Sequence, residues 1–241
     1  TKGGLLDRDF VVLIDELEGA SFALAATDDD EYAVVASFCP KFPEQVSKPL
    51  ALKILVDCSG SMEGDSIQSA KRALHHVLSH LTAEDRFSYS KFGGHTNHLF
   101  SKVKPADQFH ISAASLLIEN TNADMGGTEV EAALQSTFDL IGAQGAADVL
   151  LITDGEVWDT TNIIKAAKQS GQRIFAIGVG NAPAETLLQE LAEATGGACE
   201  LVPPNGDVQM GITRMFHRLR QPRARDIQID WGHDEEPEWV S

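Results

Sequence analysis

The stretch Leu52-Lys-Ile-Leu-Val-Asp-Cys-Ser-Gly-Ser-Met62 decides the fold, because a mostly apolar run turns polar there before a helical pattern begins. An apolar run of this length, bounded by a turn, is typical of a buried strand. The turn carries Asp57, Ser59 and Ser61, and alternation in an extended chain would place these side chains on one side. Gly60 permits the bend that brings the two hydroxyls together. Taken alone, such a turn fits a helix-capping turn as well as a metal site.

Two later segments favour the metal site. Met125-Gly-Gly-Thr-Glu129 puts Thr128 at an expected helix start after two flexible glycines, and Val149-Leu-Leu-Ile-Thr-Asp-Gly-Glu156 puts Asp154 at the end of an apolar strand. An all-oxygen set suits Mg²⁺, which prefers near-octahedral oxygen ligands, better than it suits a metal held by Cys and His. We therefore expect one Mg²⁺ site, with Mn²⁺ or Ca²⁺ as substitutes, built from Asp57, Ser59, Ser61, Thr128 and Asp154.

Strand and helix patterns alternate through residues 49–220. The alternation predicts an α/β fold with a doubly wound, mainly parallel sheet covered on both faces, and a short hairpin at 85–100. Asp65 with Gln68 fits a capping box, and Gly171 stands where a helix should stop. The expected strands cover residues 50–57, 85–92, 96–100, 147–154, 172–179 and 197–202, and the expected helices cover 65–81, 106–119, 128–143, 160–170, 183–195 and 206–219.

The three oxygen-bearing segments, in this order, resemble the metal-ion-dependent adhesion site of the von Willebrand factor type A domain, and the resemblance covers roughly residues 49–220. It implies the Rossmann-like fold of that family. It also implies that Ser59 and Ser61 bind the metal directly and that Thr128 binds directly or through water. By the same resemblance, Asp57 and Asp154 bind the ion or orient its waters. In some relatives, movement at the site is coupled to displacement of the last helix.

The flanks carry strand signals of their own. Residues 7–38 read as a three-stranded meander, and Ile227–Trp231 is one more strand candidate in the tail. We expect a β-rich flank over residues 1–48, the main domain over 49–220, and a C-terminal segment over 221–241 whose strand pairs with the first flank. These flanks are similar to those of inter-alpha-trypsin inhibitor heavy chains and their bacterial relatives, in which a VIT domain precedes the A domain. The resemblance implies that an upstream VIT-type domain is missing from this chain.

Composition fits a globular chain with one large core: 43% of the 241 residues are hydrophobic. No apolar run approaches the roughly 20 residues of a membrane span, and no signal peptide is visible. The net charge of −17 would repel nucleic acid and anionic membranes. Because the chain opens with Thr1 rather than Met, we expect a piece of a longer or processed protein. The sequence leaves the location open, and we favour a secreted, periplasmic or cell-surface setting.

The expected function is metal-dependent protein binding. Two carboxylates leave a divalent ion about neutral overall, so it can still attract an Asp or Glu from a partner protein, as the resemblance implies. A rim of Glu63, Glu129, Glu156 and Asp159, with Trp158, would surround the ion, either as a partner-binding surface or as solvated charges and a packed ring. One alternative is a structural or assembly domain that binds segments of its own longer polypeptide. A Mg²⁺-dependent phosphoryl-transfer enzyme is disfavoured, because Ser59 stands where a second acid would be needed.

Cysteines and histidines give weaker signals. Cys39, Cys58 and Cys199 cannot all pair, and we expect buried free thiols, with a Cys39–Cys199 bridge as the alternative. His76 and His80 lie one helical turn apart and could hold zinc, but no third ligand is evident in the sequence, which favours a solvated helix face.

Overall fold

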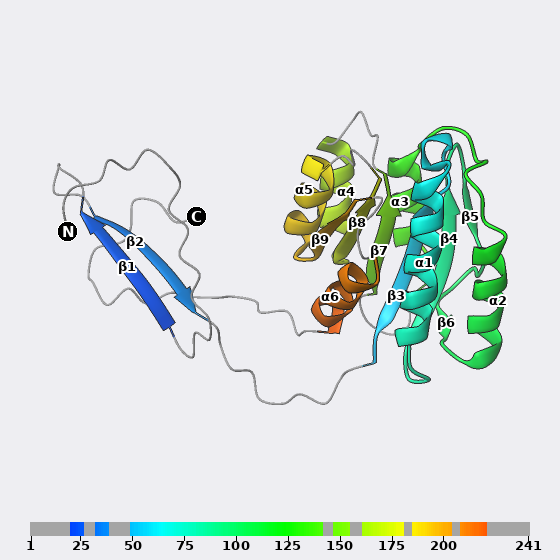
Figure 1. The fold of residues 1–241 in the computed structure, drawn as a ribbon, viewed down its shortest axis with the longest axis horizontal. Helices are drawn as coiled ribbons and strands as arrows, with labels where there is room; N and C mark the ends of the chain where they lie inside the picture. The colour runs from blue at the N-terminus through cyan, green and yellow to red at the C-terminus, as the bar shows by residue number, and fades with distance from the viewer. Residues whose placement is uncertain are drawn as a thin grey trace. The chain divides into compact units, whose positions relative to one another are not determined.

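A seven-stranded sheet forms the centre of the unit Ser47–Ser241 (Figure 1). Six of its strands follow the order β5-β4-β3-β7-β8-β9, and the seventh, β6, pairs with β4. β3, β4, β7, β8 and β9 run parallel, and the short β5 and β6 pair antiparallel with β4. This confirms the predicted α/β class and the hairpin. The strand bounds are β3 (Ala51–Asp57), β4 (Arg86–Phe92), β5 (Thr96–His98), β6 (Lys104–Pro105), β7 (Asp148–Thr153), β8 (Ile174–Val179) and β9 (Ala198–Val202).

The structure is a computed structural model, and it describes residues 20–26, 32–38, 49–141, 147–154, 161–180, 185–203 and 208–220. The chain divides into two units, Thr1–Val46 and Ser47–Ser241. In the first unit, β1 (Ala20–Ala26) and β2 (Tyr32–Phe38) form an antiparallel pair in which Ala20 lies opposite Phe38. The first strand of the expected meander and the tail strand Ile227–Trp231 lie outside the described residues, so the predicted flank module stays a prediction.

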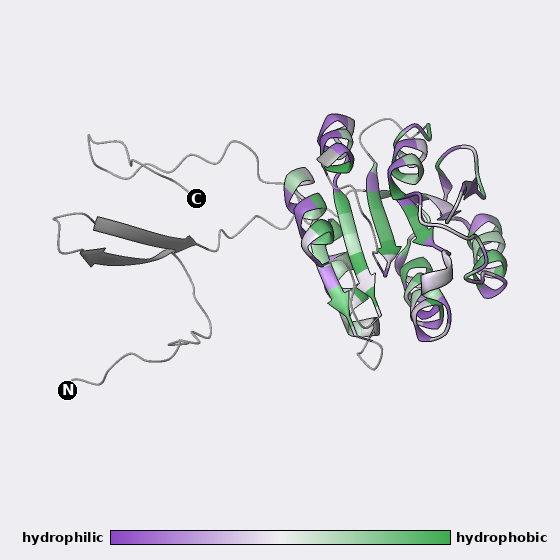
Figure 2. Cartoon of the chain, turned by 90° about the horizontal axis from the view of Figure 1, so that it is seen from above, coloured by the Kyte–Doolittle hydropathy of each residue, from purple (hydrophilic) through white to green (hydrophobic). Residues whose placement is uncertain are grey.

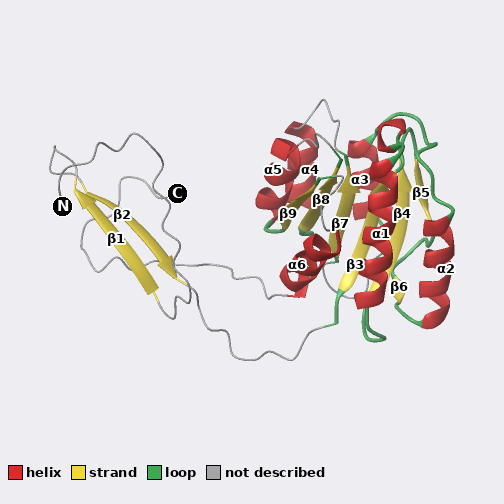
Figure 3. Ribbon diagram, viewed as in Figure 1, coloured by secondary structure: helices red, strands yellow, loops and turns green. Residues whose placement is uncertain are grey.

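Helices cover both faces of the larger sheet, and Figure 3 shows α1, α2 and α6 in front of it. The core between these three helices and the sheet contains Leu52, Ile54 and Val56 of β3. Leu55 of the same strand belongs to the core on the opposite face. This is the alternation expected for a strand buried on both faces. The helices are α1 (Asp65–His80), α2 (Gln108–Glu119) and α6 (Val208–Arg220) on one face, and α3 (Val130–Phe138), α4 (Thr161–Ser170) and α5 (Glu185–Thr195) on the other.

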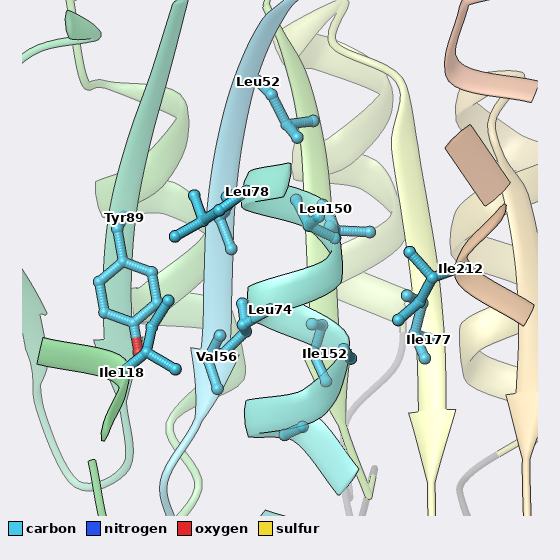
Figure 4. Close-up of a cluster of buried hydrophobic side chains, with 14 of the residues drawn as sticks. Leu52, Val56, Leu74, Leu78, Tyr89, Ile118, Leu150, Ile152, Ile177 and Ile212 are labelled. Atoms are coloured by element: carbon cyan, nitrogen blue, oxygen red, sulfur yellow. The ribbon is translucent and has the colours of Figure 1, made fainter. Parts of the chain in front are cut away.

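Apolar side chains hold these layers together. Leu74 and Leu78 of α1 and Ile212 of α6 are buried over Leu150 and Ile177 of the sheet (Figure 4). Each fully buried aliphatic side chain contributes on the order of 1.5–3 kcal/mol relative to exposure. In Figure 2 the strands of the large sheet are mostly hydrophobic, whereas the helices alternate hydrophobic and hydrophilic colours along their length. Among the described helices, none combines the length and apolar content that crossing a membrane requires.

Two local predictions were wrong. Gly64, with φ of 85°, is the N-cap of α1, so Asp65 is the first helical residue and makes no capping box. Gly64 reaches this left-handed region at little cost, and Asp65 can still act on the positive end of the helix dipole. The helix expected over 128–143 spans only Val130–Phe138. Its last carbonyl, that of Phe138, accepts hydrogen bonds from Lys53 Nζ at 2.9 Å and Gln172 Nε2 at 3.2 Å.

Two short elements escaped prediction, while one helix stop was confirmed. β6 has only two residues, too few to show a period, and the turn after β3 contains a 3₁₀ helix, η1 (Gly60–Met62). Gly171, with φ of 65°, follows the last residue of α4, as expected for a left-handed residue after a helix. Sequence patterns therefore locate the long elements and miss those that depend on only two or three residues.

Candidate metal site

The candidate site lies at the carboxyl edge of the sheet. Asp57 is the last residue of β3, and Asp154 directly follows β7, the strand hydrogen-bonded to β3. The chain crosses from β3 to β4 on one side and later to β7 on the other, so the strand order reverses here. Ligands of open α/β sheets bind at such a switch point. The two acidic residues therefore lie where the sequence placed them.

Four of the five predicted ligands form one chain of hydrogen bonds. The Ser59 amide donates to Asp57 Oδ1 at 2.8 Å, and the Ser59 and Ser61 hydroxyls lie 3.0 Å apart. The Ser61 hydroxyl donates to Asp154 Oδ1 at 3.0 Å, which joins β3 to β7 across the edge of the sheet. The expectation that an extended chain would bring these side chains together was wrong. The chain does not stay extended, because η1 folds Ser61 back toward Ser59.

Asp57 is a buried carboxyl group. Its exposed fraction is 0%, and it accepts hydrogen bonds from the Ser59 amide and, at 2.5 Å, from the Thr153 hydroxyl. Burial raises the pKa of Asp57 above its ordinary value, and the hydrogen bonds from Thr153 and Ser59 only partly oppose that rise. None of these stabilising groups is a cation. A divalent ion beside the carboxylate would supply the missing positive charge.

Thr153 was missed by the sequence reasoning. It is the only hydroxyl residue in β7 and it precedes Asp154, so its place in the apolar run was the available signal. Gly180 was missed as well. Its φ is 107°, and a Cβ atom there would lie 2.9 Å from Ser66 Oγ and 3.7 Å from Asp154 Cβ. The chain directly after β8 therefore passes beside Ser66 and Asp154, and its positive φ favours glycine at this position.

The loop that carries Thr128 is fixed to the metal turn by backbone hydrogen bonds. The Met125 amide donates to the Cys58 carbonyl at 3.0 Å, and the Gly60 amide donates to the Gly126 carbonyl at 3.1 Å. The Gly94 amide donates to the Met125 carbonyl at 2.7 Å. Thr128 itself is half-buried and precedes α3 by two residues, so it is not at the helix start that the sequence predicted. Although two flexible glycines precede Thr128, these backbone hydrogen bonds hold the loop to Cys58, Gly60 and Gly94.

The predicted rim is described only in part. Glu63 and Glu129 are exposed, and Glu129 is the N-cap residue of α3. Glu156, Trp158 and Asp159 lie outside the described residues. Cys58 has an exposed fraction of 0% and a free thiol whose pKa burial raises to about 12. Cys199 is also free but only partly buried, which corrects the prediction of a buried thiol there, and Cys39 is outside the described residues.

The donor set fits a hard divalent cation. It combines two carboxylates with two hydroxyls that hydrogen bonds join into one series, and it includes a buried carboxylate without a cationic neighbour among its stabilising groups. Mg²⁺ takes such ligands and usually keeps several waters, so a small number of protein oxygens is enough. Asp57, Ser59, Ser61 and Asp154 would hold the ion, and the Thr128 loop lies against the same turn.

These features define a doubly wound α/β domain with an oxygen-rich turn at the switch point of its sheet. A family model of the von Willebrand factor type A domain matches residues 50–201. The chain belongs to this family, whose domains are typically protein-interaction modules and generally not enzymes.

Relatives and a solved structure agree with this assignment. The chain is 26% identical, over 96% of its length, to von Willebrand factor A domain-containing protein DDB_G0292028 of Dictyostelium discoideum. It is 30% identical, over 83% of its length, to von Willebrand factor A domain-containing protein 5A of Homo sapiens. It spans about a quarter of these relatives, 26% and 27% of their respective lengths. The fold is similar to that of a von Willebrand factor type A protein from Catenulispora acidiphila, with a TM-score of 0.59, 19% identity, and coverage of 84% of this chain and 45% of that one.

Proposed function

We propose that this domain is a Mg²⁺-dependent protein-binding module, in which the metal coordinates an Asp or Glu side chain of a partner. The observation that carries the proposal is the series of hydrogen bonds in which the Ser59 amide donates to Asp57 and the Ser59 and Ser61 hydroxyls lead on to Asp154. It gathers ligands from two neighbouring strands at one point of the sheet edge. Thr128 would complete the set, directly or through a water.

The charge balance supports an acidic partner group. Asp57 and Asp154 would together cancel the charge of one divalent ion, and the serine and threonine hydroxyls add none. An ion held this way keeps enough electrophilicity to attract one more anionic oxygen. Mg²⁺ is six-coordinate, so a water position can be exchanged for a carboxylate. Mn²⁺ and Ca²⁺ would bind the same oxygens with longer bonds or looser geometry.

The surroundings favour a partner that is basic or mixed in charge around its coordinating acid. Glu63 and Glu129 are exposed beside the turn and beside α3, and the whole chain carries a net charge of −17. Opposite charges on the partner would speed association, and added salt would slow it. Nucleic acid does not fit this charge. An adhesive module of this kind suits a secreted, periplasmic or cell-surface protein, which is the location we propose.

A second candidate is an assembly domain whose ligands are segments of its own longer polypeptide. It is favoured by the fact that the chain spans only about a quarter of its relatives, 26% and 27% of their lengths. An upstream VIT-type domain would be one source of such a segment. Phosphoryl transfer is less well supported, because the Ser59 hydroxyl, at the position of a second acid, is paired with the Ser61 hydroxyl.

A pull-down from the source cell and its surroundings separates these functions. The bait is the chain in Mg²⁺ or in chelator, with a Ser59→Ala/Ser61→Ala bait as the binding-dead form and Ser112→Ala, an exposed serine of α2, as the matched control. We expect a protein that Mg²⁺ retains on the wild-type and Ser112→Ala baits and that the double variant loses. Partners retained equally by the double variant would contradict metal-mediated recognition. Retention only of fragments of the parent polypeptide would favour the assembly function.

A further inference from the structure

A pair of histidines lies where α1 packs against α6, at the opposite end of α1 from the metal turn. His76 and His80 are four residues apart on α1, and His80 is its last residue. Their rings have centroids 4.3 Å apart and planes tilted by 59°. Residues at this spacing share one face of a helix, so both imidazoles can reach one point in space. His80 is exposed and His76 is half-buried, so this point is open to solvent.

The hydrogen bond of His80 determines which nitrogen can bind a ligand. Its Nδ1 lies 2.8 Å from the carbonyl oxygen of His76. A carbonyl can only accept, so Nδ1 must carry the proton and donate it. In the neutral ring, Nε2 then keeps its lone pair. A histidine that ligates a metal commonly donates its other ring N–H to a backbone carbonyl, which fixes the ring. His80 is already held in that state.

The second histidine faces α6. His76 Nε2 lies 3.2 Å from the Thr213 hydroxyl. A hydroxyl oxygen can accept as well as donate, so one neutral oxygen lies beside the two imidazole rings. A metal ion bonded to two imidazoles at roughly 2.0–2.1 Å needs their nitrogens roughly 3.3 Å apart. With the ring centroids 4.3 Å apart, rotation of the His76 ring alone can bring the nitrogens to that separation, so His80 keeps its hydrogen bond to the His76 carbonyl.

We propose that His76 and His80 form a second metal site, selective for borderline transition metals such as Zn²⁺ and Ni²⁺, with Thr213 Oγ1 or water filling the remaining positions. Imidazole suits these metals, whereas the carboxylate and hydroxyl oxygens at the sheet edge suit Mg²⁺. Within the part of the chain that the structure describes, no group of three or more His, Cys, Asp or Glu residues could hold a metal. The site therefore has two strong protein ligands and exchanges its metal readily.

The neighbouring charges leave room for a cation. Arg220 Nη2 lies 3.3 Å from the carbonyl of His80, and its charge is already paired with Asp85. A metal at this point would join α1 to α6 through Thr213, and its binding to the folded chain alone would stabilise the domain. Metal binding requires neutral imidazoles, so acid should release the ion. The site does not depend on the proposed function, because its ligands lie on different residues and take a different class of metal.

Calorimetric titration of the 241-residue chain with Zn²⁺ and with Ni²⁺ tests the proposal. The variants are His76→Gln and His80→Gln, and the matched control is His75→Gln, the half-buried neighbour on the same helix. We expect each of the first two changes to weaken Ni²⁺ binding at least tenfold and His75→Gln to leave it unchanged. His80 is exposed, so its variant should fold, and circular dichroism checks this. Binding by folded His80→Gln that equals the wild type would overturn the proposal. So would an equal loss in His75→Gln, or Ni²⁺ binding that only Ser59→Ala/Ser61→Ala removes.

Discussion

The substitution Gly93→Ala adds one methyl group and should move the loop that carries Thr128 away from the turn that carries Ser59 and Ser61. A Cβ atom at this position would lie 2.5 Å from Met125 Cβ, 2.7 Å from Met125 O and 2.8 Å from Met125 C. Favourable contacts between carbon atoms occur at about 3.5–4.0 Å, so the backbone at Met125 would have to retreat by about 1 Å. That backbone binds the Cys58 carbonyl through Met125 N and accepts from Gly94 N. Gly93→Ala should therefore push the Thr128 loop away from the metal turn.

The size of the effect follows from these contacts. Forcing a methyl group into a packed region costs about 1–3 kcal/mol, and each weakened backbone hydrogen bond contributes about 0.5–1.5 kcal/mol. We expect the free energy of unfolding to fall by about 2–4 kcal/mol. Displacement of Thr128 should also weaken Mg²⁺ binding, and a loss of about 1.4 kcal/mol would be a tenfold fall in affinity.

Gly127→Ala is the matched control, because Gly127 lies in the loop that carries Thr128 and a Cβ atom there meets nothing within 4 Å. Urea unfolding gives the stability of each variant, and calorimetry gives its Mg²⁺ affinity. The reasoning is refuted if Gly93→Ala and Gly127→Ala have the same unfolding free energy and the same affinity. It is also refuted if Gly127→Ala is the more damaged of the two.

Three further predictions concern other parts of the domain. Gly180→Ala would force an alanine to adopt a φ of 107°, so it should lower the free energy of unfolding in urea by about 1–3 kcal/mol, and unchanged stability would argue against strain there. Burial alone would raise the pKa of Asp85, but hydrogen bonds, first among them that of Arg220, bring this pKa below its ordinary value. The ionised Asp85 therefore stabilises the fold fully at neutral pH, and this stabilisation is lost as the pH falls through the lowered pKa. Arg220→Met should therefore cost about 3 kcal/mol in urea unfolding at pH 7, with acid unfolding beginning at a higher pH, and a pH profile parallel to the wild type would contradict this. Burial lowers the pKa of Lys53 from the ordinary 10.5 to about 8, although the charge of Asp139 opposes this shift. Between pH 8 and pH 10.5 the unfolded chain therefore binds more protons than the folded chain. The free energy of unfolding should rise with pH across this range by up to about 3 kcal/mol. Lys53→Met should lack this rise, and identical pH slopes for the two proteins would count against a strained buried amine.

The sequence predicted the long elements well because their signals are local. β3, β7 and β8 are almost entirely apolar, and both faces of each are covered, so no surrounding structure was needed to recognise them. The end of α3 could not be predicted, since the Phe138 carbonyl is satisfied by Lys53 from β3 and by Gln172 from a distant loop. Such partners become neighbours only after folding.

Some features of the candidate site could be predicted from the sequence and others could not. Asp57 and Asp154 could be placed from strand ends alone, because the carboxyl ends of neighbouring parallel strands share an edge. The hydroxyl of Thr153 on Asp57 and the close approach of Gly180 to Asp154 depend on the register of three strands. A sequence does not state that register. The attachment of the Thr128 loop through backbone atoms also carries no residue signature beyond the glycines that permit it.

Titration of Mg²⁺ into the wild-type chain and into Ser59→Ala/Ser61→Ala, with both shown to be folded, tests the central claim most directly. Our account predicts one Mg²⁺ bound per wild-type chain, none bound by the double variant, and a stabilisation of the wild type alone of about 2.7 kcal/mol when free Mg²⁺ is 100 times its dissociation constant. Equal Mg²⁺ binding by the two proteins, or no binding by the folded wild type, would contradict it.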